Sequence, residues 1–297
     1  MDVKKAVIPA AGFGTRFLPV TKSQPKEMLP IIDTPTVQYV VEEAVDSGIT
    51  DILMVVGKSK RAIEEHFYPN FELEYQLAEK NKEAELDLIQ RISNLANIHF
   101  VWQRELNGLG DAVSYARSFV GSEPFALLLG DTLLGSNDPK RPITQQLVDV
   151  YKQYGCSVVG VEEIPQEKVN RYGIVGGTKI TKRVYQVDQL VEKPTVEDAP
   201  SNLAIASRYV FTPEIFQYLA ETPPGKNDEI QLTDAMASML QYHGMSAYQL
   251  DGVRYDIGNK LDFLKTNVIF ALQRDDLAPE MKEFILGMAE ELKAQER

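Results

Sequence analysis

A glycine-rich loop directly after a short apolar strand constrains this 297-residue chain more than any other feature. The strand and loop read Ile8-Pro-Ala-Ala-Gly-Phe-Gly-Thr-Arg-Phe17, and Pro25-Lys-Glu-Met-Leu-Pro30 follows them. The two glycines, which lack side chains, let the backbone turn tightly and direct several N–H groups at one anion. Arg16 and Lys26 add positive charge beyond the loop. The pattern therefore predicts a cradle for a triphosphate.

Two better-known phosphate-binding loops do not fit this segment. A P-loop requires Gly-Lys-Ser/Thr, but Gly14 is followed by Thr15-Arg16. A dinucleotide-binding loop requires a third glycine where Phe17 stands and a helix directly afterwards, whereas Pro19 and Pro25 keep the segment irregular. For a bare pair of glycines, a tight turn with solvated charges is the plainer alternative. The two glycines together with Arg16 and Lys26 favour the phosphate cradle.

The charge balance limits the partners of the chain. Its 31 Lys and Arg residues face 43 Asp and Glu residues, for a net charge of −12. This excess argues against binding to nucleic acids or membrane surfaces, because both are anionic themselves. A phosphorylated ligand must therefore be captured by local cations and a divalent metal. Since neither a signal peptide nor an apolar stretch of membrane-spanning length is recognisable, we expect a cytoplasmic protein.

The alternation of strand-like and helical patterns predicts an α/β fold. A helical apolar stripe over residues 37–45 ends at Gly48, which is typical of a helix that packs on a sheet. Such an order favours a Rossmann-like, mostly parallel sheet with flanking helices, whose ligands lie beyond the carboxyl ends of the strands. The glycine loop, residues 103–110 and Gly130-Asp131 would then share one rim. The strand-like runs span residues 6–8, 51–56, 98–102 and 125–129.

The pattern becomes β-rich after Cys156, which predicts a second lobe over the sheet. We expect residues 1–272 to form one domain, with a nucleotide-binding half over about 1–155 and a sugar-binding half over about 156–272. Residues 273–297 are expected to form a C-terminal helical arm that could pair with another subunit.

Two carboxylates are candidate metal ligands. Asp131 follows a buried strand directly, and Asp256 ends a strand-like stretch before a glycine turn. Mg²⁺ prefers one or two carboxylates together with phosphate oxygens, so a pair of distant acids suits it. Either residue taken alone would be explained better as the cap of a turn.

Glu192 and Lys193 form a candidate sugar-phosphate site at the end of a β segment, where Pro194 stops further pairing. Glu192 would accept hydrogen bonds from sugar hydroxyls, and Lys193 would hold the phosphate. A surface Glu-Lys pair before a turn is the alternative interpretation.

Gln103, with Gly108 a few residues later, is the candidate base reader. A glutamine amide offers an acceptor beside a donor, which matches the N3–H and O4 edge of uracil or thymine. A glycine at position 108 would let the backbone approach the base. The alternative is that Gln103 satisfies only local backbone groups.

Taken together, these segments closely resemble the bacterial-type UDP-glucose pyrophosphorylases (UTP:glucose-1-phosphate uridylyltransferases) of the sugar-nucleotidyltransferase superfamily. The resemblance spans nearly the whole chain. It is carried by residues 10–19, 25–30, 103–104, 108–112, 129–131, 172–173, 192–194, 229–234 and 256–258.

This resemblance implies a Mg²⁺-dependent condensation of UTP with glucose 1-phosphate to UDP-glucose and pyrophosphate, performed by a homodimer or homotetramer. It implies catalytic roles for Arg16, Lys26 and Lys193, and metal binding by Asp131 and Asp256. Gly173, Glu192 and Lys193 would hold the sugar phosphate. The implied nucleotide-binding residues are Ala11, Gly12, Gly14, Thr15, Gln103 and Gly108.

The implied chemistry requires no protein nucleophile, because a phosphate monoester with a second pKa near ~6 is mostly dianionic at neutral pH. Two positions depart from the family pattern: Thr132 stands where many relatives carry a second Asp, and Asp111 where they commonly carry His. Two alternatives therefore remain. One is a glucose-1-phosphate thymidylyltransferase, since thymine shares the edge that Gln103 would read. The other is a catalytically silent, sugar-nucleotide-binding regulatory paralogue, which Thr132 makes conceivable.

Overall fold

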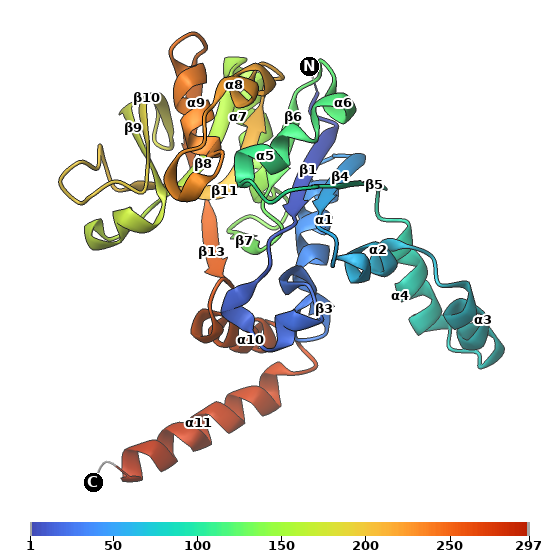
Figure 1. The fold of residues 1–297 in the computed structure, drawn as a ribbon. Helices are drawn as coiled ribbons and strands as arrows, with labels where there is room; N and C mark the ends of the chain where they lie inside the picture. The colour runs from blue at the N-terminus through green and yellow to red at the C-terminus, as the bar shows by residue number, and fades with distance from the viewer. Residues whose placement is uncertain (1, 296–297) are drawn as a thin grey trace.

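In the computed structural model, one nine-stranded sheet runs through both halves of the chain (Figure 1). The structure describes residues 2–295, except for the side chains of Lys226 and Asp256. The strand order is β5-β4-β1-β6-β11-β8-β12-β10-β9. The strands are β1 (Lys5–Ala10), β4 (Asp51–Val56), β5 (Asn97–Trp102), β6 (Phe125–Leu128), β8 (Ser157–Glu163), β9 (Gly173–Lys179), β10 (Val184–Glu192), β11 (Leu203–Phe211) and β12 (Met245–Gln249).

The four strands of the first half are parallel, as their sequence pattern predicts. In the register of β1, β4 and β5, Ala10 lies beside Val56, and Val56 lies beside Trp102. Five successive residues of β4 are buried, because helices cover both faces of this part of the sheet. The carboxyl ends of these strands consequently form one edge, which carries the glycine loop.

The strands of the second half are hydrogen-bonded to the sheet of the first half through β11. β11 pairs antiparallel with β6 and β8, and β9 pairs antiparallel with both β10 and β11, so the strands of the second half curl back on β11. The predicted β-rich second half is confirmed, and it is joined to the first half because the edge of β6 offers backbone groups that β11 can satisfy. The short strand β12, with the sequence Met-Ser-Ala-Tyr-Gln, was not predicted from its sequence at all.

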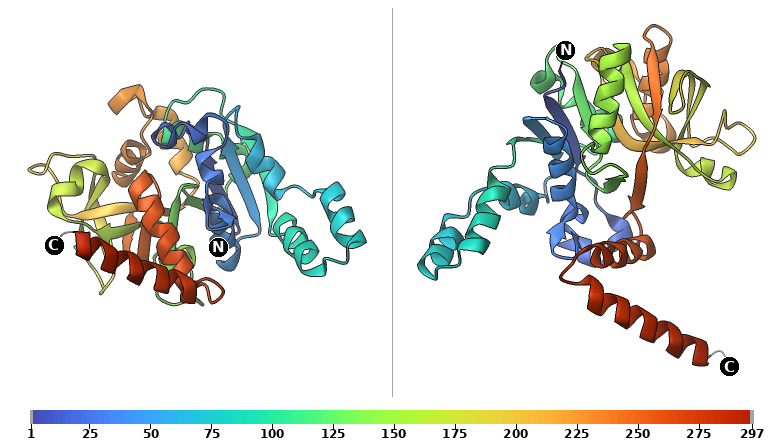
Figure 2. Two further views of the ribbon diagram at one scale, coloured as in Figure 1. Left: turned by 90° about the horizontal axis from the view of Figure 1, so that it is seen from below. Right: turned by 180° about the vertical axis from the view of Figure 1, so that it is seen from behind.

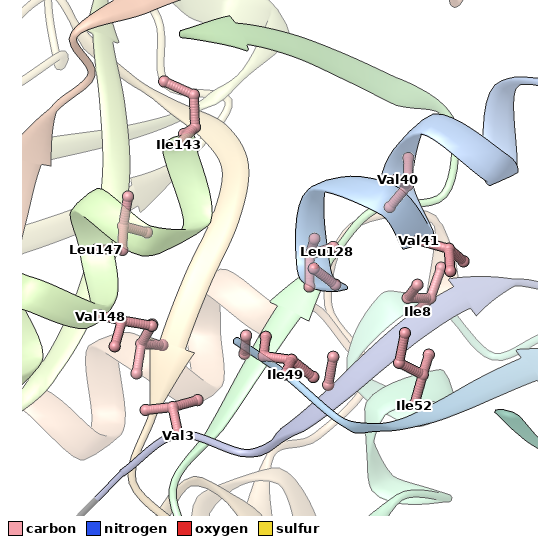
Figure 3. Close-up of a cluster of buried hydrophobic side chains, with 14 of the residues drawn as sticks. Val3, Ile8, Val40, Val41, Ile49, Ile52, Leu128, Ile143, Leu147 and Val148 are labelled. Carbon is pink, nitrogen blue, oxygen red and sulfur yellow. The ribbon is translucent and has the colours of Figure 1, made fainter. Parts of the chain in front are cut away.

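Helices cover both faces of the sheet and bury two apolar cores. On one face, α1 (Thr36–Asp46) lies beside strand residues such as Ile8 and Ile52, and α7 (Ile143–Tyr154) packs over β8 and β11 (Figure 3). Each fully buried Ile, Leu or Val stabilises the fold by about 1.5–3 kcal/mol. On the other face the second core lies under α5 (Leu109–Ser114), α6 (Arg117–Val120), α8 (Ile215–Glu221) and α9 (Leu232–Leu240).

Two helical appendages extend away from the sheet (Figure 2). The first follows α2 (Arg61–Phe67) and consists of α3 (Phe71–Glu79) and α4 (Glu83–Ser93), which bury none of their residues. The second consists of α10 (Lys260–Gln273) and α11 (Ala278–Gln295) at the C-terminus. Across residues 2–295, every helix is either too short or too polar to cross a membrane.

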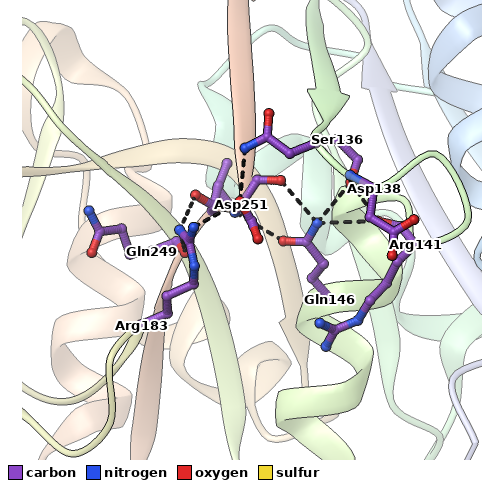
Figure 4. Close-up of polar contacts among 9 residues, drawn as sticks. Ser136, Asp138, Arg141, Gln146, Arg183, Gln249 and Asp251 are labelled. Carbon is purple, nitrogen blue, oxygen red and sulfur yellow. Dashed lines mark hydrogen bonds and ion pairs between the residues drawn. The ribbon is translucent and has the colours of Figure 1, made fainter.

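A two-stranded ribbon leads toward α10, and at one of its ends Asp256 pairs with Thr132, the residue directly after Asp131. It pairs β7 (Thr132–Ser136) with β13 (Gly252–Asp256). A polar network anchors its near end (Figure 4): Gln146 Nε2 donates to Ser136 Oγ over 3.1 Å, and Arg183 Nη2 donates to Asp251 Oδ1 over 2.8 Å. A second two-stranded pair, β2 (Pro30–Ile31) with β3 (Thr34–Pro35), lies near α10.

A buried ion pair holds the other end of the ribbon from inside the protein. Arg208 of β11 is only 1% exposed, and its Nη2 lies 2.6 Å from Glu43 Oε2 of α1. The same nitrogen donates to the Thr132 carbonyl over 2.9 Å. Thr144 donates its hydroxyl to Glu43 Oε1 over 2.6 Å. The guanidinium therefore fixes the backbone immediately after Asp131.

We expect Arg208→Met to lower the free energy of unfolding by about 3–5 kcal/mol, because it leaves the Glu43 carboxylate buried without its partner. Urea unfolding followed by circular dichroism measures this loss. Lys152→Met is the control, since it removes a solvent-exposed pair with Asp2 and should cost no more than about 1 kcal/mol. Equal losses in the two variants would contradict the argument.

Candidate functional site

The glycine loop after β1 adopts a conformation that needs glycine at position 14. Gly14 has φ +66°, and a Cβ there would lie 2.9 Å from Lys26 Cβ. Its carbonyl accepts from Thr21 Oγ1 over 2.8 Å and from the Phe17 N–H over 2.9 Å. A Cβ on Gly12 would lie 3.6 Å from Lys26 Nζ, so the loop passes close to the lysine ammonium. The glycine loop and the Lys26 side chain are therefore packed against each other.

This loop forms one wall of a cavity of about 190 Å³, and the chain just before and within α10 forms another. The two segments are joined by a hydrogen bond from Arg16 Nη1 to the Gly258 carbonyl at 3.4 Å. The Phe17 and Phe263 rings also meet edge to face, with centroids 5.6 Å apart. Five of the predicted residues share this cavity: Gly14, Thr15, Arg16, Lys26 and Asp131.

An ion pair between Lys26 and Asp131 lies at the centre of this group, with Nζ 2.5 Å from Oδ2. Burial alone would lower the pKa of Lys26, but the charges of Asp131 and Glu27 outweigh it and raise the pKa. Burial would likewise raise the pKa of Asp131, but Lys26 lowers it on balance through its charge and its hydrogen bond. Both groups are therefore charged at neutral pH.

A second ion pair, which the sequence pattern did not reveal, lies beneath the first. Lys60 Nζ is 2.8 Å from Glu27 Oε2, and the two side chains are only 4% and 1% exposed. Glu27 Oε1 is also 4.0 Å from Lys26 Nζ. Burial raises the pKa of Glu27 and lowers that of Lys60. Lys60, Glu27, Lys26 and Asp131 thus form a row of alternating charges that leads from the interior to the cavity.

The backbone of Asp256 lies beside this row, because it pairs with Thr132 in the β7–β13 ribbon. The side chain of Asp256 lies outside the described part of the structure. Two residues earlier on β13, Arg254 Nη2 contacts Glu162 Oε1 at 2.6 Å and its guanidinium lies 4.6 Å from the Tyr172 ring centroid. No group of three or more His, Cys, Asp or Glu side chains that could hold a metal occurs among the described residues.

Gln103 and Gly108 belong to a second group, after β5. The Gln103 N–H donates to the Val56 carbonyl over 2.9 Å, and its Nε2 donates to Asp111 Oδ2 over 2.6 Å. Gly108 has φ +102°, and a Cβ there would lie 2.8 Å from the Ile230 carbonyl oxygen. The glycine at 108 is therefore required by packing against residues 229–230, a reason that the sequence alone did not suggest.

Ala11 joins this second group to the glycine loop. Its side chain is buried, and a Cβ on Gly57, directly after β4, would lie 3.0 Å from the Ala11 carbonyl oxygen. Since Gln103 bonds the residue before Gly57, the ends of β1, β4 and β5 meet here. The predicted nucleotide-binding residues consequently follow one edge of the sheet.

Gly173, Glu192 and Lys193 form a third group at the β9–β10 pair. Lys193 Nζ lies 2.9 Å from Glu192 Oε1, and Thr233 Oγ1 donates to Glu192 Oε2 over 2.7 Å. A Cβ on Gly173 would lie 3.0 Å from the Thr233 hydroxyl and 3.2 Å from Glu192 Oε2. Burial, with the nearby charge of Glu192, raises the pKa of Asp234 beside this group. Thr233 and Asp234 lie within residues 229–234, which carry part of the family resemblance, but they were not predicted as site residues.

The three groups follow the order of the strands. The Gln103 group follows β5, the loop and Asp131 follow β1 and β6, and the Gly173 group lies at β9 and β10 on the far side of β11. The lining of the 190 Å³ cavity includes only the middle group. The arrangement offers hydrogen bonds to a planar base at one end, positive charge for phosphates in the middle, and a carboxylate beside an ammonium at the other end.

The charged state of Asp131 should make stability depend on pH. Because its folded-state pKa lies below the ordinary value of 3.8, its contribution is fully present above 3.8 and is lost as the pH falls through the folded-state pKa. We therefore expect the stability advantage of wild type over Asp131→Asn to shrink below pH 3.8. Urea unfolding at a series of pH values measures it. The advantage should be smaller in a Lys26→Met background, and a pH-independent difference would contradict the assignment.

Comparison with known proteins gives consistent results. A family model described as nucleotidyl transferase matches residues 5–271. The UTP–glucose-1-phosphate uridylyltransferase of Bacillus subtilis is 51% identical over 286 residues, which cover 96% of this chain and 97% of that enzyme. A crystal structure of UDP-glucose pyrophosphorylase complexed with UDP-glucose superposes with a TM-score of 0.84 at 42% identity, covering 92% of this chain and all of that one. The UTP-bound enzyme of Acinetobacter baumannii gives 0.87 at 39% identity, covering 96% and 99%.

Proposed function

This chain belongs to the nucleotidyl transferase family, and from that premise we infer that it condenses UTP with glucose 1-phosphate to UDP-glucose and pyrophosphate. It is a nucleotidyltransferase. The observation that carries this conclusion is the single cavity in which the glycine loop, Arg16, Lys26 and Asp131 meet. A triphosphate needs such a concentration of donors and cations in a protein whose net charge is −12.

The reaction consists of an in-line attack by the glucose 1-phosphate oxygen on the α-phosphorus of UTP. The new P–O bond forms as the bond to pyrophosphate breaks, so no protein nucleophile is needed. We assign to Arg16 and Lys26 the stabilisation of negative charge on the triphosphate and on the departing pyrophosphate. Glu27 and Lys60 hold the Lys26 ammonium in position from below. Lys193 steers the attacking phosphate.

The residues present fit a divalent cation. Asp131 ends the turn after β6 beside the cavity, and the backbone of Asp256 pairs with the neighbouring Thr132. Two carboxylates together with phosphate oxygens are the ligands that Mg²⁺ prefers, so Asp131 and Asp256 would hold it. When bound, the ion supplies neutralisation of phosphate charge. Within the protein, Lys26 orients Asp131 through their 2.5 Å contact.

For the base and the sugar, the proposal uses the two outer groups. Gln103 reads the base together with Ala11, Gly12 and Gly108, and Gly14 and Thr15 contact the phosphates. Glu192 accepts from glucose hydroxyls, since Thr233 already orients its carboxylate. Gly173 lets the backbone pack directly against Glu192 and Thr233, where a side chain would displace the carboxylate.

We extend the proposal to the organisation of the chain. Residues 1–272 would form the nucleotidyltransferase domain, and residues 273–297 a helical arm. Helix α11 buries none of its residues, and Phe284, Leu286 and Leu292 are each more than half exposed. Such apolar surface suits a homodimer or homotetramer. The substrates are metabolites of the cytoplasm, where we place the enzyme.

Pyrophosphate release from UTP and glucose 1-phosphate, measured with and without Mg²⁺, tests the proposed function. We expect release only when both substrates and the ion are present. Lys26→Ala and Asp131→Ala should each lower turnover by on the order of 10² or more, because each removes charge placed for the transition state. Lys22→Ala is the matched control, an exposed cation of the same segment. Near-normal turnover in folded Lys26→Ala would refute its role.

The sugar site is tested by Gly173→Ala. Its new methyl group would lie 2.9 Å from Ile205 Cδ1 and 3.2 Å from Glu192 Oε2, closer than ordinary contacts allow. We expect KM for glucose 1-phosphate to rise about tenfold or more while KM for UTP stays within about twofold. Steady-state kinetics with each substrate varied in turn measures both constants. The exposed Gly287→Ala on α11 serves as a control, and parallel changes in both KM values would place Gly173 outside the sugar site.

A further inference from the structure

Asp111 fixes the direction in which the Gln103 amide faces, and we propose that this carboxylate thereby selects uracil over cytosine in the nucleotide. The inference rests on the proposed function, in which Gln103 reads the base. Gln103 is 6% exposed, and its Nε2 donates to Asp111 Oδ2 over 2.6 Å. A carboxylate only accepts hydrogen bonds. Turning the amide by 180° would press its Oε1 against Oδ2, two acceptors in contact, so one orientation is enforced.

The rest of the amide remains available to a ligand. Within the described part of the chain, no protein group donates to Gln103 Oε1. This oxygen is not fully enclosed by the protein, so a ligand can reach it. The other N–H of Nε2 meets only the Gly108 carbonyl at 3.5 Å, too long for a strong bond. Gln103 therefore presents one acceptor and one donor in a fixed order.

This fixed order distinguishes the pyrimidines. Uracil presents N3–H beside the O4 carbonyl, whereas cytosine presents the N3 lone pair beside an amino group. With Oε1 opposite N3 and Nε2 opposite the 4-substituent, uracil makes two hydrogen bonds. Cytosine held in the same place sets lone pair against lone pair and N–H against N–H, and each buried mismatch is unfavourable. Thymine shares the edge of uracil, so Asp111 does not affect the choice between UTP and dTTP.

The backbone holds Asp111 in place for this task. It lies in the first turn of α5, and the Gly110 N–H before it donates to the Ile230 carbonyl over 2.9 Å. Capping of α5 does not explain the residue, because Gly108 occupies the N-cap and no side chain makes a capping hydrogen bond there. The carboxylate is aimed at Gln103 instead.

The test compares kcat/KM for UTP, CTP and dTTP in wild type and in Asp111→Asn. An asparagine can donate to Oε1 or accept from Nε2, so both amide orders become available. We expect the CTP-to-UTP ratio to rise by at least about tenfold, with the dTTP-to-UTP ratio unchanged. The lost negative charge affects all three triphosphates equally and cancels in the ratios. Glu105→Gln, which removes one charge from the same loop, should leave both ratios at their wild-type values.

The outcomes separate this inference from the proposed function. If Gln103→Ala raises the CTP-to-UTP ratio but Asp111→Asn does not, Gln103 reads the base and the role of Asp111 is overturned. A parallel rise of both ratios in Asp111→Asn would mean a loosened pocket and would also overturn it. If Gln103→Ala changes no ratio, the base contact itself fails. Thermal unfolding monitors folding, and Asp111→Ser, whose hydroxyl both donates and accepts, replaces the asparagine variant if that one does not fold.

Discussion

The ion pair between Lys26 and Asp131 is the interaction on which the rest of the site depends. It joins the loop after β1 to the turn after β6, two adjacent parallel strands whose carboxyl ends share one edge of the sheet. Both sides are supported from the interior: Glu27 and Lys60 stand below the lysine, and Arg208 holds the backbone that follows Asp131. The supporting charges of Glu27, Lys60 and Arg208 are buried and cost desolvation free energy, and they are retained here where they position other charges.

The sheet is the element along which the binding groups for the two substrates are arranged. Its order places the Gln103 group, the phosphate cavity and the Gly173 group in succession across the strands. A nucleoside triphosphate and a sugar phosphate that meet at the α-phosphorus need such a linear arrangement of base, phosphates and sugar. The second half of the chain can provide the sugar end because β11 continues the sheet from β6.

Local signals made much of this predictable from the sequence. The strand β1, the helix α1 and the need for glycine at position 14 follow from short-range patterns, and they are correct. The family resemblance pointed to uridylyl transfer, with which the comparisons agree. The missed features depend on residues that meet only after folding. Lys60 and Glu27 are 33 residues apart, and Arg208 and Glu43 are 165 apart. No local sequence pattern indicates which residue pairs with which in either case.

Two lysines proposed to face substrate each carry their own carboxylate, at 2.5 Å for Lys26 with Asp131 and 2.9 Å for Lys193 with Glu192. This pairing has a consequence for selectivity. In a protein with a net charge of −12, unpaired cations would attract any anion at close range. A lysine that is already paired with a carboxylate exchanges this partner only for a ligand that offers more negative charge or more hydrogen bonds at the same distance. Triphosphates and phosphate monoester dianions meet that condition, and monovalent anions do not.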